Sequence, residues 1–507
     1  MSDKVIVARS LEQFAILLRC AGLGAFWVIF MWGFWTSGIY ALGINTTIFL
    51  GAVAWLLYAS DDNVRQLMRC GKSWIIPLTL MTLSYALFEN PFIKLVTIVV
   101  LPISWSLFYS AAALSRDKTF VWTPLFIAVS ILSTLHFPRC FIHSVSDYFL
   151  LLRSRLHFKF THRTVLQRIL QGICLFLALA LLVVVPLLVS ADALFGSRLL
   201  DVANLVAEVI QVIFECSLVA RLLCLLGVSC AVLALVKLSR VLSDVVSNAN
   251  LPVIDSIVSG IVISGMLIIY SLFIWVQFER LWYTELPTQF AAAENVVKGG
   301  FWQLVAISLI NILLFTWCYR RTSQSVQGIL AGFTVACLVL VLSAANRMWL
   351  YVTTYGLSYE KFYAAYTVLF CIVVFITLLA SLAGREAKDN VKSTCFTFLW
   401  MYGIVCVLPV EAFVLSTNIK LSTREDSRID LVDMTMLSAD VLGQAESARA
   451  LLTEQAGPSR SLFWRLWYAR QNQHLATRRW FELNLSNLWN GWGERSYEIE
   501  ERAPGER

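Results

Sequence analysis

Residues 326–380 read VQGILAGFTVACLVLVLSAANRMWLYVTTYGLSYEKFYAAYTVLFCIVVFITLLA, two long apolar runs joined by a polar and aromatic connection. A helix needs about 20 apolar residues to cross the hydrocarbon core of a bilayer, and each run approaches that length with few charges. The stretch therefore predicts two membrane-spanning helices that are joined at one membrane surface.

The whole chain has the same character. Of its 507 residues, 58% are hydrophobic and 14% are charged, and the mean hydropathy is +0.71. Soluble domains carry about 25% charged residues. The formal charge of +7 is spread over many short loops. Such a distribution is typical of topology signals in a membrane protein and argues against a nucleic-acid partner.

Apolar runs of spanning length recur along the chain, which predicts an all-α, polytopic transmembrane helix bundle with about eleven to twelve spans. The runs lie near residues 22–41, 44–60, 73–89, 91–114, 119–138, 169–190, 217–236, 256–277, 301–318, 326–345, 362–383 and 393–415.

Lysines and arginines gather in alternate loops, for example before the first run, near residues 65–72 and near residues 385–392. Basic loops are retained in the cytoplasm. The N-terminus is therefore expected in the cytoplasm and the C-terminus on the external side. We interpret the N-terminal region as an uncleaved first span, because no small-residue cleavage site closes a short apolar region.

Residues 119–138 break this alternation, because basic loops flank them on both sides. We expect this run to lie along the interface or to re-enter the membrane. The following residues, 139–168, mix apolar and basic side chains at roughly helical spacing. They predict an amphipathic helix on the inner leaflet with anionic lipid as its partner. A cytoplasmic docking surface is the alternative.

The composition changes after residue 417, so the chain divides into a transmembrane helical region, residues 1–417, and a polar tail, residues 418–507. The tail places Trp464, Trp467 and Trp480 among arginines. It predicts a Trp-rich amphipathic helical segment at the membrane surface or on the ends of the spans.

Motifs that accompany catalysis in membranes are missing from the sequence, among them H-E-x-x-H, C-x-x-C and G-x-S-x-G. We therefore expect no catalytic residue, no metal site and no cofactor, and we favour a protein that is not an enzyme. The sequence leaves the oligomeric state and the ligand undetermined.

The connection after the run at 326–345 offers the first candidate site. If the helix continues to Tyr355, then Arg347, Tyr351 and Tyr355 share one face at intervals of four residues. Gly356 is placed to end that helix in a left-handed conformation, and Ser358 to cap the next. An aromatic girdle with a helix end explains most of this pattern. The alternative is an external binding site in which Arg347 holds an anion.

Other polar residues at membrane depth extend this hypothesis. Arg221 lies inside an apolar run, where a charged side chain costs about 2.5–3.5 kcal/mol. Glu215, Glu279 and Glu411 are its candidate partners, and either a structural ion pair or a ligand path is compatible with the sequence. We predict that Arg221, Arg347, Tyr351, Tyr355, Asp192 and Glu411 form a polar cluster on the outer half of the bundle.

Several segments resemble a known family. RMWLYVTTYGLSYEKFYA at residues 347–364 resembles the R-x-x-LY-x-x-x-YGL signature of the bacterial family called domain of unknown function 4173. LLVSADALF at 187–195 and VKGGFWQLVAIS at 297–308 are similar to two further segments of it, and LSADVL and RRWFELNLS to its closing motifs. The sequence departs from the pattern at Asn295 and Val296. The resemblance implies a multi-pass protein of the bacterial inner membrane, without an assigned activity.

These observations favour a non-catalytic membrane protein with a structural, sensory or scaffold role, which binds an anionic lipid or ligand at the outer face. A transporter or channel for a small solute or lipid is the first alternative. It requires helices broken near the midplane, for which Gly260, Gly265 and Pro409 are the candidate positions. An enzyme that modifies envelope lipids is the second, and it requires a carboxylate or histidine in an open groove.

Overall fold

The computed structural model describes residues 2–60, 64–65, 72–114, 124–156, 217–246, 256–276, 305–319, 322–384, 390–424, 429, 431–448, 452, 462, 464–471 and 478–489. Within these ranges the chain forms α-helices and short 3-10 helices and no β-strand. The prediction of an all-α membrane protein is confirmed.

Seven helices of the described part are long and apolar enough to cross a membrane, or eight if the bent pair α18–α19 counts as one span. The protein is therefore a multi-pass membrane protein. The count of eleven to twelve spans stays a prediction, since the run at 169–190 lies outside the described residues. The candidate spans belong to α1 (Ser2–Phe30), α6 (Pro91–Leu114), α7 (Pro124–Ser133) with η2 (Thr134–His136) and α8 (Phe137–Leu156), α12 (Ser217–Val246), α13 (Ser256–Val276), α16 (Gln324–Tyr355), α17 (Tyr359–Ala383), and the pair α18 (Asn390–Cys406) and α19 (Val410–Ser422).

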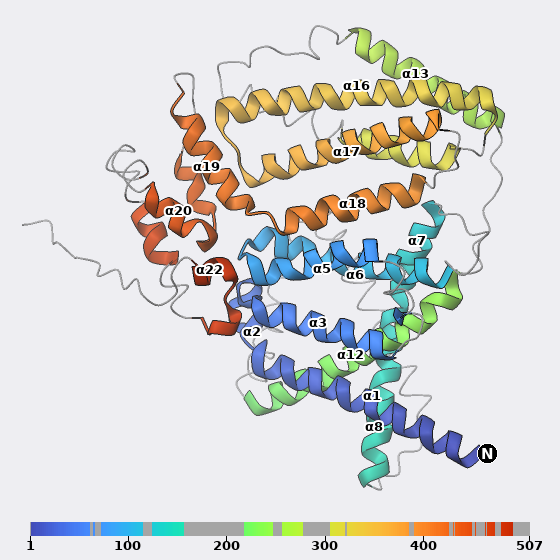
Figure 1. The fold of residues 1–507 in the computed structure, drawn as a ribbon, viewed down its shortest axis with the longest axis vertical. Coiled ribbons are helices and arrows are strands. Elements are labelled where there is room, and N and C mark those ends of the chain that lie inside the picture. The colour runs from blue at the N-terminus through green and yellow to red at the C-terminus, as the bar shows by residue number, and fades with distance from the viewer. Residues whose placement is uncertain are drawn as a thin grey trace, which may run out of the picture.

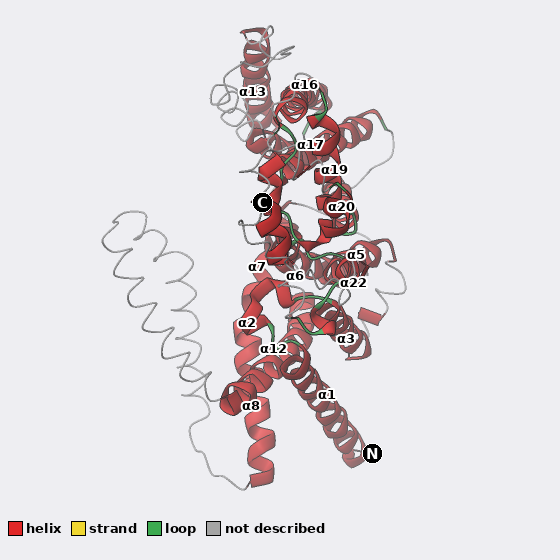
Figure 2. Ribbon diagram, turned by 90° about the vertical axis from the view of Figure 1, so that its left-hand side faces the viewer, coloured by secondary structure: helices red, strands yellow, loops and turns green. Residues whose placement is uncertain are grey.

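Most of these helices run side by side in a flat row, with the shorter apolar helices α3 (Ile44–Ser60) and α5 (Lys72–Leu87) among them (Figure 1). Neighbours in the row pack in the order α13, α16, α17, α18, α5, α3 and α1, and α12 packs on α1 and α6. Figure 2 looks along the axes of most of these helices and shows that the row is thin.

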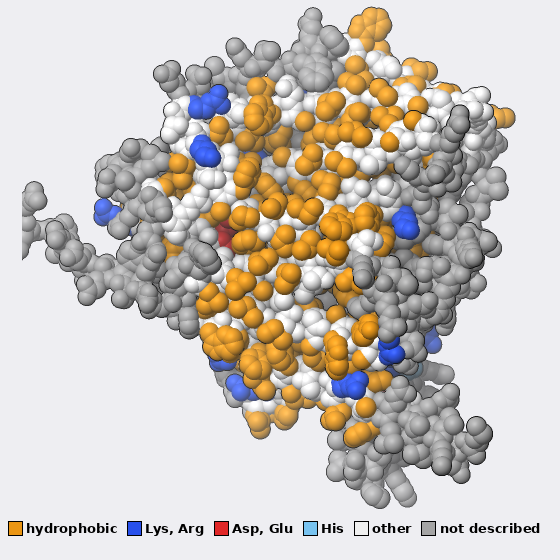
Figure 3. Space-filling model, viewed as in Figure 1, with side chains coloured by type: hydrophobic (Ala, Val, Ile, Leu, Met, Phe, Trp, Pro, Cys, Tyr) orange, Lys and Arg blue, Asp and Glu red, His pale blue; other side chains and the backbone are white. Residues whose placement is uncertain are grey.

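The surface of the row fits a lipid environment. In Figure 3 hydrophobic side chains cover the middle of the visible face, and lysines and arginines lie toward its left and right margins. On helices at the edges of the row, Leu218, Ile261 and Trp275 expose 69%, 68% and 80% of their surface. Large apolar side chains with this degree of exposure are stable in contact with hydrocarbon, whereas their exposure to water is unfavourable in free energy.

The two ends of the helices differ in what covers them. One end, at the left in Figure 1, carries the α5–α6 turn, the α16–α17 bend and the described parts of the C-terminal tail. These parts are η4 (Leu431–Met436), η5 (Ala439–Val441), α20 (Leu442–Ser447), η7 (Trp480–Glu482) and α22 (Leu485–Trp489). We call this the tail end and the opposite one the basic end, after the lysines and arginines that flank its helices.

The segment after residue 124 runs across the other helices. α8 lies roughly at right angles to α3 and α5 in both views (Figures 1 and 2). The Tyr148 hydroxyl donates to the carbonyl of Leu17 in α1 at 2.9 Å, and Lys237 of α12 pairs with Asp147 at 2.7 Å. Residues 126–148 are apolar enough to count as a candidate span. The direction of α8 across the other helices agrees instead with a segment that lies along the membrane interface. Residues 157–168 of the predicted amphipathic helix lie outside the described residues.

The tail packs on the helix ends. Trp464, Trp467 and Leu483 are buried in the same hydrophobic cluster as residues of α5, α6, α18 and α19. Because α19 continues from Val410 to Ser422, the predicted boundary after residue 417 falls inside a helix. The division into two domains stays a prediction.

Candidate functional site

The predicted site at the α16–α17 bend is a tightly capped helix end. α16 is 32 residues long, which corresponds to about 48 Å and exceeds the hydrocarbon thickness. Gly356 ends it at a φ of +79°, and its N–H donates to the Val352 carbonyl at 2.9 Å. The hydroxyl of Ser358 caps α17 by accepting from the Lys361 N–H at 3.5 Å.

Lys361 places a cation at the end of α16. Its ammonium group lies 4.4 Å from the centre of the Tyr351 ring and donates to the Gly356 carbonyl at 2.7 Å. The Tyr355 ring centre lies 5.2 Å from that of Tyr351. A cation that satisfies the last carbonyls of a helix stabilises its C-terminus. Arg347 lies on α16 one turn before Tyr351, and the anion site predicted there stays a prediction.

The bend is also tied to α19. The side-chain amide of Asn418 accepts from the Leu357 N–H at 2.6 Å and donates to the Leu357 carbonyl at 2.7 Å. A Cβ atom at residue 356 would lie 2.8 Å from the Asn418 Oδ1. Glycine is therefore required here both for its backbone conformation and for space.

Among the described residues of the predicted outer cluster, Arg221 lies apart from Arg347, Tyr351 and Tyr355. Arg221 belongs to α12, and its guanidinium lies 5.2 Å from the centre of the Trp32 ring. In Figure 1, α12 and α16 lie far apart in the row. Glu411 lies at the start of α19 beside the tail, and Asp192 lies outside the described residues. The sequence indicates how deep a residue lies in the membrane, but it does not indicate which helices are neighbours, so these residues could not be grouped correctly.

The structure brings Glu411 together with four other ionisable side chains at the tail end. Glu89 lies in the α5–α6 turn, Lys94 in the first turn of α6 and Glu411 in the first turn of α19, while Asp440 and Arg478 belong to the tail. Lys94 interacts electrostatically with each of the other four. We call these five residues the tail clasp.

A buried ion pair joins the tail to the helices. Arg478 Nη2 lies 2.6 Å from Glu89 Oε1, and the two side chains are 2% and 1% exposed. The other Glu89 oxygen accepts from the Asn487 side-chain amide at 3.0 Å. The Arg478 guanidinium also lies 5.6 Å from the Tyr40 ring centre. Removing one partner of such a pair leaves a buried charge without compensation.

Asp440 binds the backbone of the same turn. Its carboxylate accepts from the N–H groups of Glu89, at 2.8 Å to each oxygen, and of Asn90, at 3.0 Å. The Ser486 hydroxyl, from another part of the tail, donates to it as well. The N–H groups at the start of a helix have no acceptor within the helix. Asp440 of the tail supplies the acceptor for the Glu89 and Asn90 N–H groups that precede α6.

Lys94 lies inside the apolar run that becomes α6 and is 1% exposed. Its ammonium group donates to the Leu42 carbonyl in the turn before α3, and the Tyr85 hydroxyl donates to the Lys94 carbonyl at 3.2 Å. A buried ammonium requires compensating carboxylates, and Glu89 and Asp440 are close enough to act on it.

The pKa values of Glu89 and Asp440 are shifted in opposite directions. Burial would raise the pKa of Glu89, but the Arg478 and Lys94 charges and the hydrogen bonds from Arg478 and Asn487 outweigh it and lower that pKa. Loss of hydration, and then the nearby Glu89 carboxylate, raise the pKa of Asp440 to about 6. Both groups are therefore mainly ionised at neutral pH, where they balance Lys94 and Arg478.

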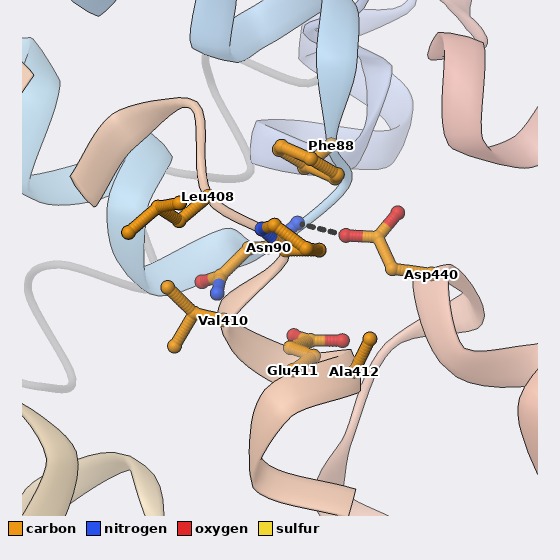
Figure 4. A pocket seen from close by; sticks show the side chains of 8 residues that line it. Phe88, Asn90, Leu408, Val410, Glu411, Ala412 and Asp440 are labelled. Carbon is orange, nitrogen blue, oxygen red and sulfur yellow. Dashed lines mark hydrogen bonds between the residues drawn. The ribbon is translucent and has the colours of Figure 1, made fainter. Parts of the chain in front are cut away.

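Glu411 lines a small cavity between the bent pair and the tail. The cavity has a volume of about 20 Å³, and its lining includes Asn90, Pro409 and Asp440 (Figure 4). Glu411 is 2% exposed, and its Oε2 accepts from the N–H and the hydroxyl of Ser438 at 2.9 and 2.5 Å. A cavity of this size holds about one water molecule, not a substrate.

Metal coordination is not suggested by the described residues, among which no three His, Cys, Asp or Glu side chains are arranged to hold an ion. The carboxylates of the clasp accept hydrogen bonds from the backbone, serine hydroxyls, an amide and a guanidinium. This arrangement can hold segments together and can bind protons.

Comparison with known proteins identifies the family. The model of a family described as Domain of unknown function (DUF4153) matches residues 75–448, about three quarters of the chain. The chain belongs to the DUF4153 family. No curated protein and no solved structure matches it. Glu89, Lys94, Glu411 and Asp440 lie within the DUF4153 region, and Arg478 follows it, so the clasp ties that region to the end of the tail.

This finding corrects the resemblance to domain of unknown function 4173. The short motifs that suggested it, such as YGL, include residues that cap and end helices, and helix ends of this kind do not distinguish one membrane family from another. The SAD-x-x-F segment, Asn295 and Val296 lie outside the described residues. The DUF4153 match assigns no activity, and the multi-pass membrane architecture rests on the apolar helices.

Sequence reasoning missed most of the clasp. A lysine inside an apolar run was a usable signal for Lys94, because an ionisable group in a span is costly unless it has a role. The LSADVL and RRWFELNLS segments, which contain Asp440 and Arg478, were noted only as similarities. Nothing in the sequence paired either of them with Glu89.

Proposed function

We propose that this DUF4153 protein has a non-catalytic, structural or sensory role in the membrane, and that the tail clasp is its central device. The clasp holds the tail across the ends of the spans, so that the tail and the helix bundle respond as one unit. The observation that carries the proposal is the buried Arg478–Glu89 ion pair, which joins residues 389 positions apart.

The chemistry of the site supports a structural role over an enzymatic one. An enzyme acting on envelope lipids needs an acid or base in an open groove, but Glu411 is buried beside a cavity of about 20 Å³. Glu89 and Asp440 are engaged by donors from the tail and the α5–α6 turn. Their oxygens stabilise contacts between segments.

The orientation is part of the proposal. Described residues of the basic segments, such as Arg65, Lys237 and Lys392, lie at the helix ends opposite the tail, and cationic loops are retained in the cytoplasm. We place the tail end, with the C-terminus, on the external side of a bacterial inner membrane and the N-terminus in the cytoplasm. α8, with its basic and apolar side chains, then lies at the inner leaflet and binds anionic lipid there.

Protease digestion of sealed vesicles tests both the clasp and the orientation. In right-side-out vesicles, external protease should leave the wild-type tail largely intact and should cleave it quickly in Arg478→Met. Arg479→Met is the matched control, since Arg479 is the exposed neighbour and should behave as wild type. Equal cleavage of the two variants would contradict the clasp, and cleavage only in inverted vesicles would reverse the orientation.

A transporter is the second candidate, favoured by one observation. α18 and α19 are bent by 71° at a short break that contains Pro409, and the first turn of α19 carries a buried carboxyl group. By contrast, α13 runs unbroken through Gly260 and Gly265. Proton flux into proteoliposomes, followed with a luminal pH-sensitive dye, tests this function. A flux equal to that of empty liposomes would count against it.

A further inference from the structure

The Glu411 carboxyl group uses its two oxygens differently. Oε2 accepts two hydrogen bonds from Ser438, which fixes the side chain against the tail. Oε1 is buried and has no hydrogen-bond partner among the described protein atoms. The Asn90 Nδ2 is likewise without one, because the Asn90 Oδ1 is turned to the N–H groups of Phe92 and Ile93 at 3.1 Å. Asn90 is 2% exposed and lines the same cavity as Glu411.

Charge balance makes an ionised Glu411 costly. Asp440 in η5 and Glu89 in the α5–α6 turn act on Glu411, and Glu411 acts on Lys94 of α6. Arg478 of the tail is paired with Glu89. Two of these groups are cationic and two are anionic, so the set is already neutral. A third carboxylate would leave one uncompensated negative charge in a buried site that already holds two carboxylates, and burial strongly disfavours such a charge.

From this geometry we infer that Glu411 is a proton-binding site of the tail clasp. The carboxylate takes its proton from solvent hydronium and forms an O–H bond at Oε1, because the Ser438 donors occupy Oε2. The cavity has room for one water molecule, which accepts hydrogen bonds from Glu411 Oε1 and Asn90 Nδ2 and links the site to solvent.

Loss of this proton changes the contact between α19 and the tail. The ionised group repels the Asp440 and Glu89 carboxylates, and the Asp440 carboxylate is bound to the turn because it accepts from the N–H groups of Glu89 and Asn90. Repulsion between them favours separation of Ser438 and η5 from the start of α19. The tail is therefore held most firmly while Glu411 carries its proton and is released as the pH rises. The site rests on the clasp geometry and does not depend on the scaffold role.

The test compares Glu411→Gln with wild type over a range of pH. Glutamine copies the neutral carboxyl group in shape and keeps an acceptor for Ser438, so at neutral pH the variant should keep the wild-type resistance of the tail to protease. From neutral to about pH 9, tail cleavage should rise at least several-fold in wild type and clearly less in the variant. Glu360→Gln removes an exposed carboxylate and is the matched control.

Superimposed pH profiles of wild type and Glu411→Gln would overturn the inference. So would a Glu411→Gln protein that loses its tail protection at neutral pH while Glu360→Gln keeps it. If Glu411→Gln does not fold, infrared spectroscopy of the wild type decides: a protonated carboxyl band should persist at neutral pH and should disappear together with tail protection. Absence of that band at neutral pH refutes the proton site.

Discussion

Two ion pairs of nearly equal length hold this molecule together at opposite ends of its helices. At the tail end, Arg478 and Glu89 lie 2.6 Å apart and are 2% and 1% exposed. At the basic end, Lys237 and Asp147 lie 2.7 Å apart and are 27% and 40% exposed. The first joins the tail to the α5–α6 turn, and the second holds α8 against α12.

The comparison shows that distance alone does not give the value of an ion pair. Water and salt screen the exposed pair, so its contribution is about 0–1 kcal/mol. The buried pair has no water to replace a lost partner, so breaking it costs about 3–5 kcal/mol. Trp464, Trp467 and Leu483 of the tail are buried in the same hydrophobic cluster as Ile93, which follows the α5–α6 turn.

The largest effect is expected when the buried pair loses its cation. Arg478→Met should lower the free energy of unfolding by about 3–5 kcal/mol, because Glu89 is left charged and buried. Thermal unfolding in detergent, followed by tryptophan fluorescence, measures this. The double variant Glu89→Leu with Arg478→Met should recover much of the loss. A loss no larger than that of Arg479→Met would mean that burial does not govern the pair.

The next effect concerns the packing that buries the pair. Gly43→Ala would place a Cβ atom 2.5 Å from the Leu483 carbonyl oxygen, which also accepts from the Ile44 N–H at 3.2 Å. Backbone must shift to relieve this overlap, at a cost of about 1–3 kcal/mol. Gly51→Ala is the control, since its Cβ would meet nothing within 4 Å. Equal melting temperatures for the two variants would show that the tail is not docked at Gly43.

A pH-dependent effect is expected at Asp440. Its pKa in the folded protein, about 6, lies above that of an unfolded aspartate. The folded state therefore binds this proton more tightly, and the Asp440 contribution to stability increases as the pH falls from about 6 to about 4. The pKa of Glu89 is lowered in the folded protein, so the contribution of Glu89 to stability decreases as the pH falls further. Asp440→Asn should flatten the slope of melting temperature between about pH 4 and pH 6, and an unchanged slope would contradict the assignment.

The smallest effect is expected at the exposed pair. Lys237→Met should change the free energy of unfolding by less than about 1 kcal/mol. The melting temperature of the wild type, measured in low and high salt, should differ from that of the variant only in low salt. A loss as large as that of Arg478→Met would show that the partly exposed pair is as important as the buried one.

Local features of the fold could be predicted because they depend on neighbouring residues. The helix end at Gly356 and the cap at Ser358 follow from backbone conformation and short-range hydrogen bonds, and the long apolar runs follow from the cost of exposing polar groups to lipid. The separation of Arg221 from Arg347 could not be predicted, because two residues at similar depth can lie on helices that are far apart in the row.

By itself, the amino-acid sequence determined that this protein is an all-helical, multi-pass membrane protein and where several of its helices end, since hydropathy and capping act over a few turns. Only the tertiary structure decided that Glu89 meets Arg478 and Asp440, and that Glu411 lies beside them. These residues come from segments separated by hundreds of positions, and only the packing of the tail on the helix ends removes the water between them. That removal of water turns ordinary polar residues into a site.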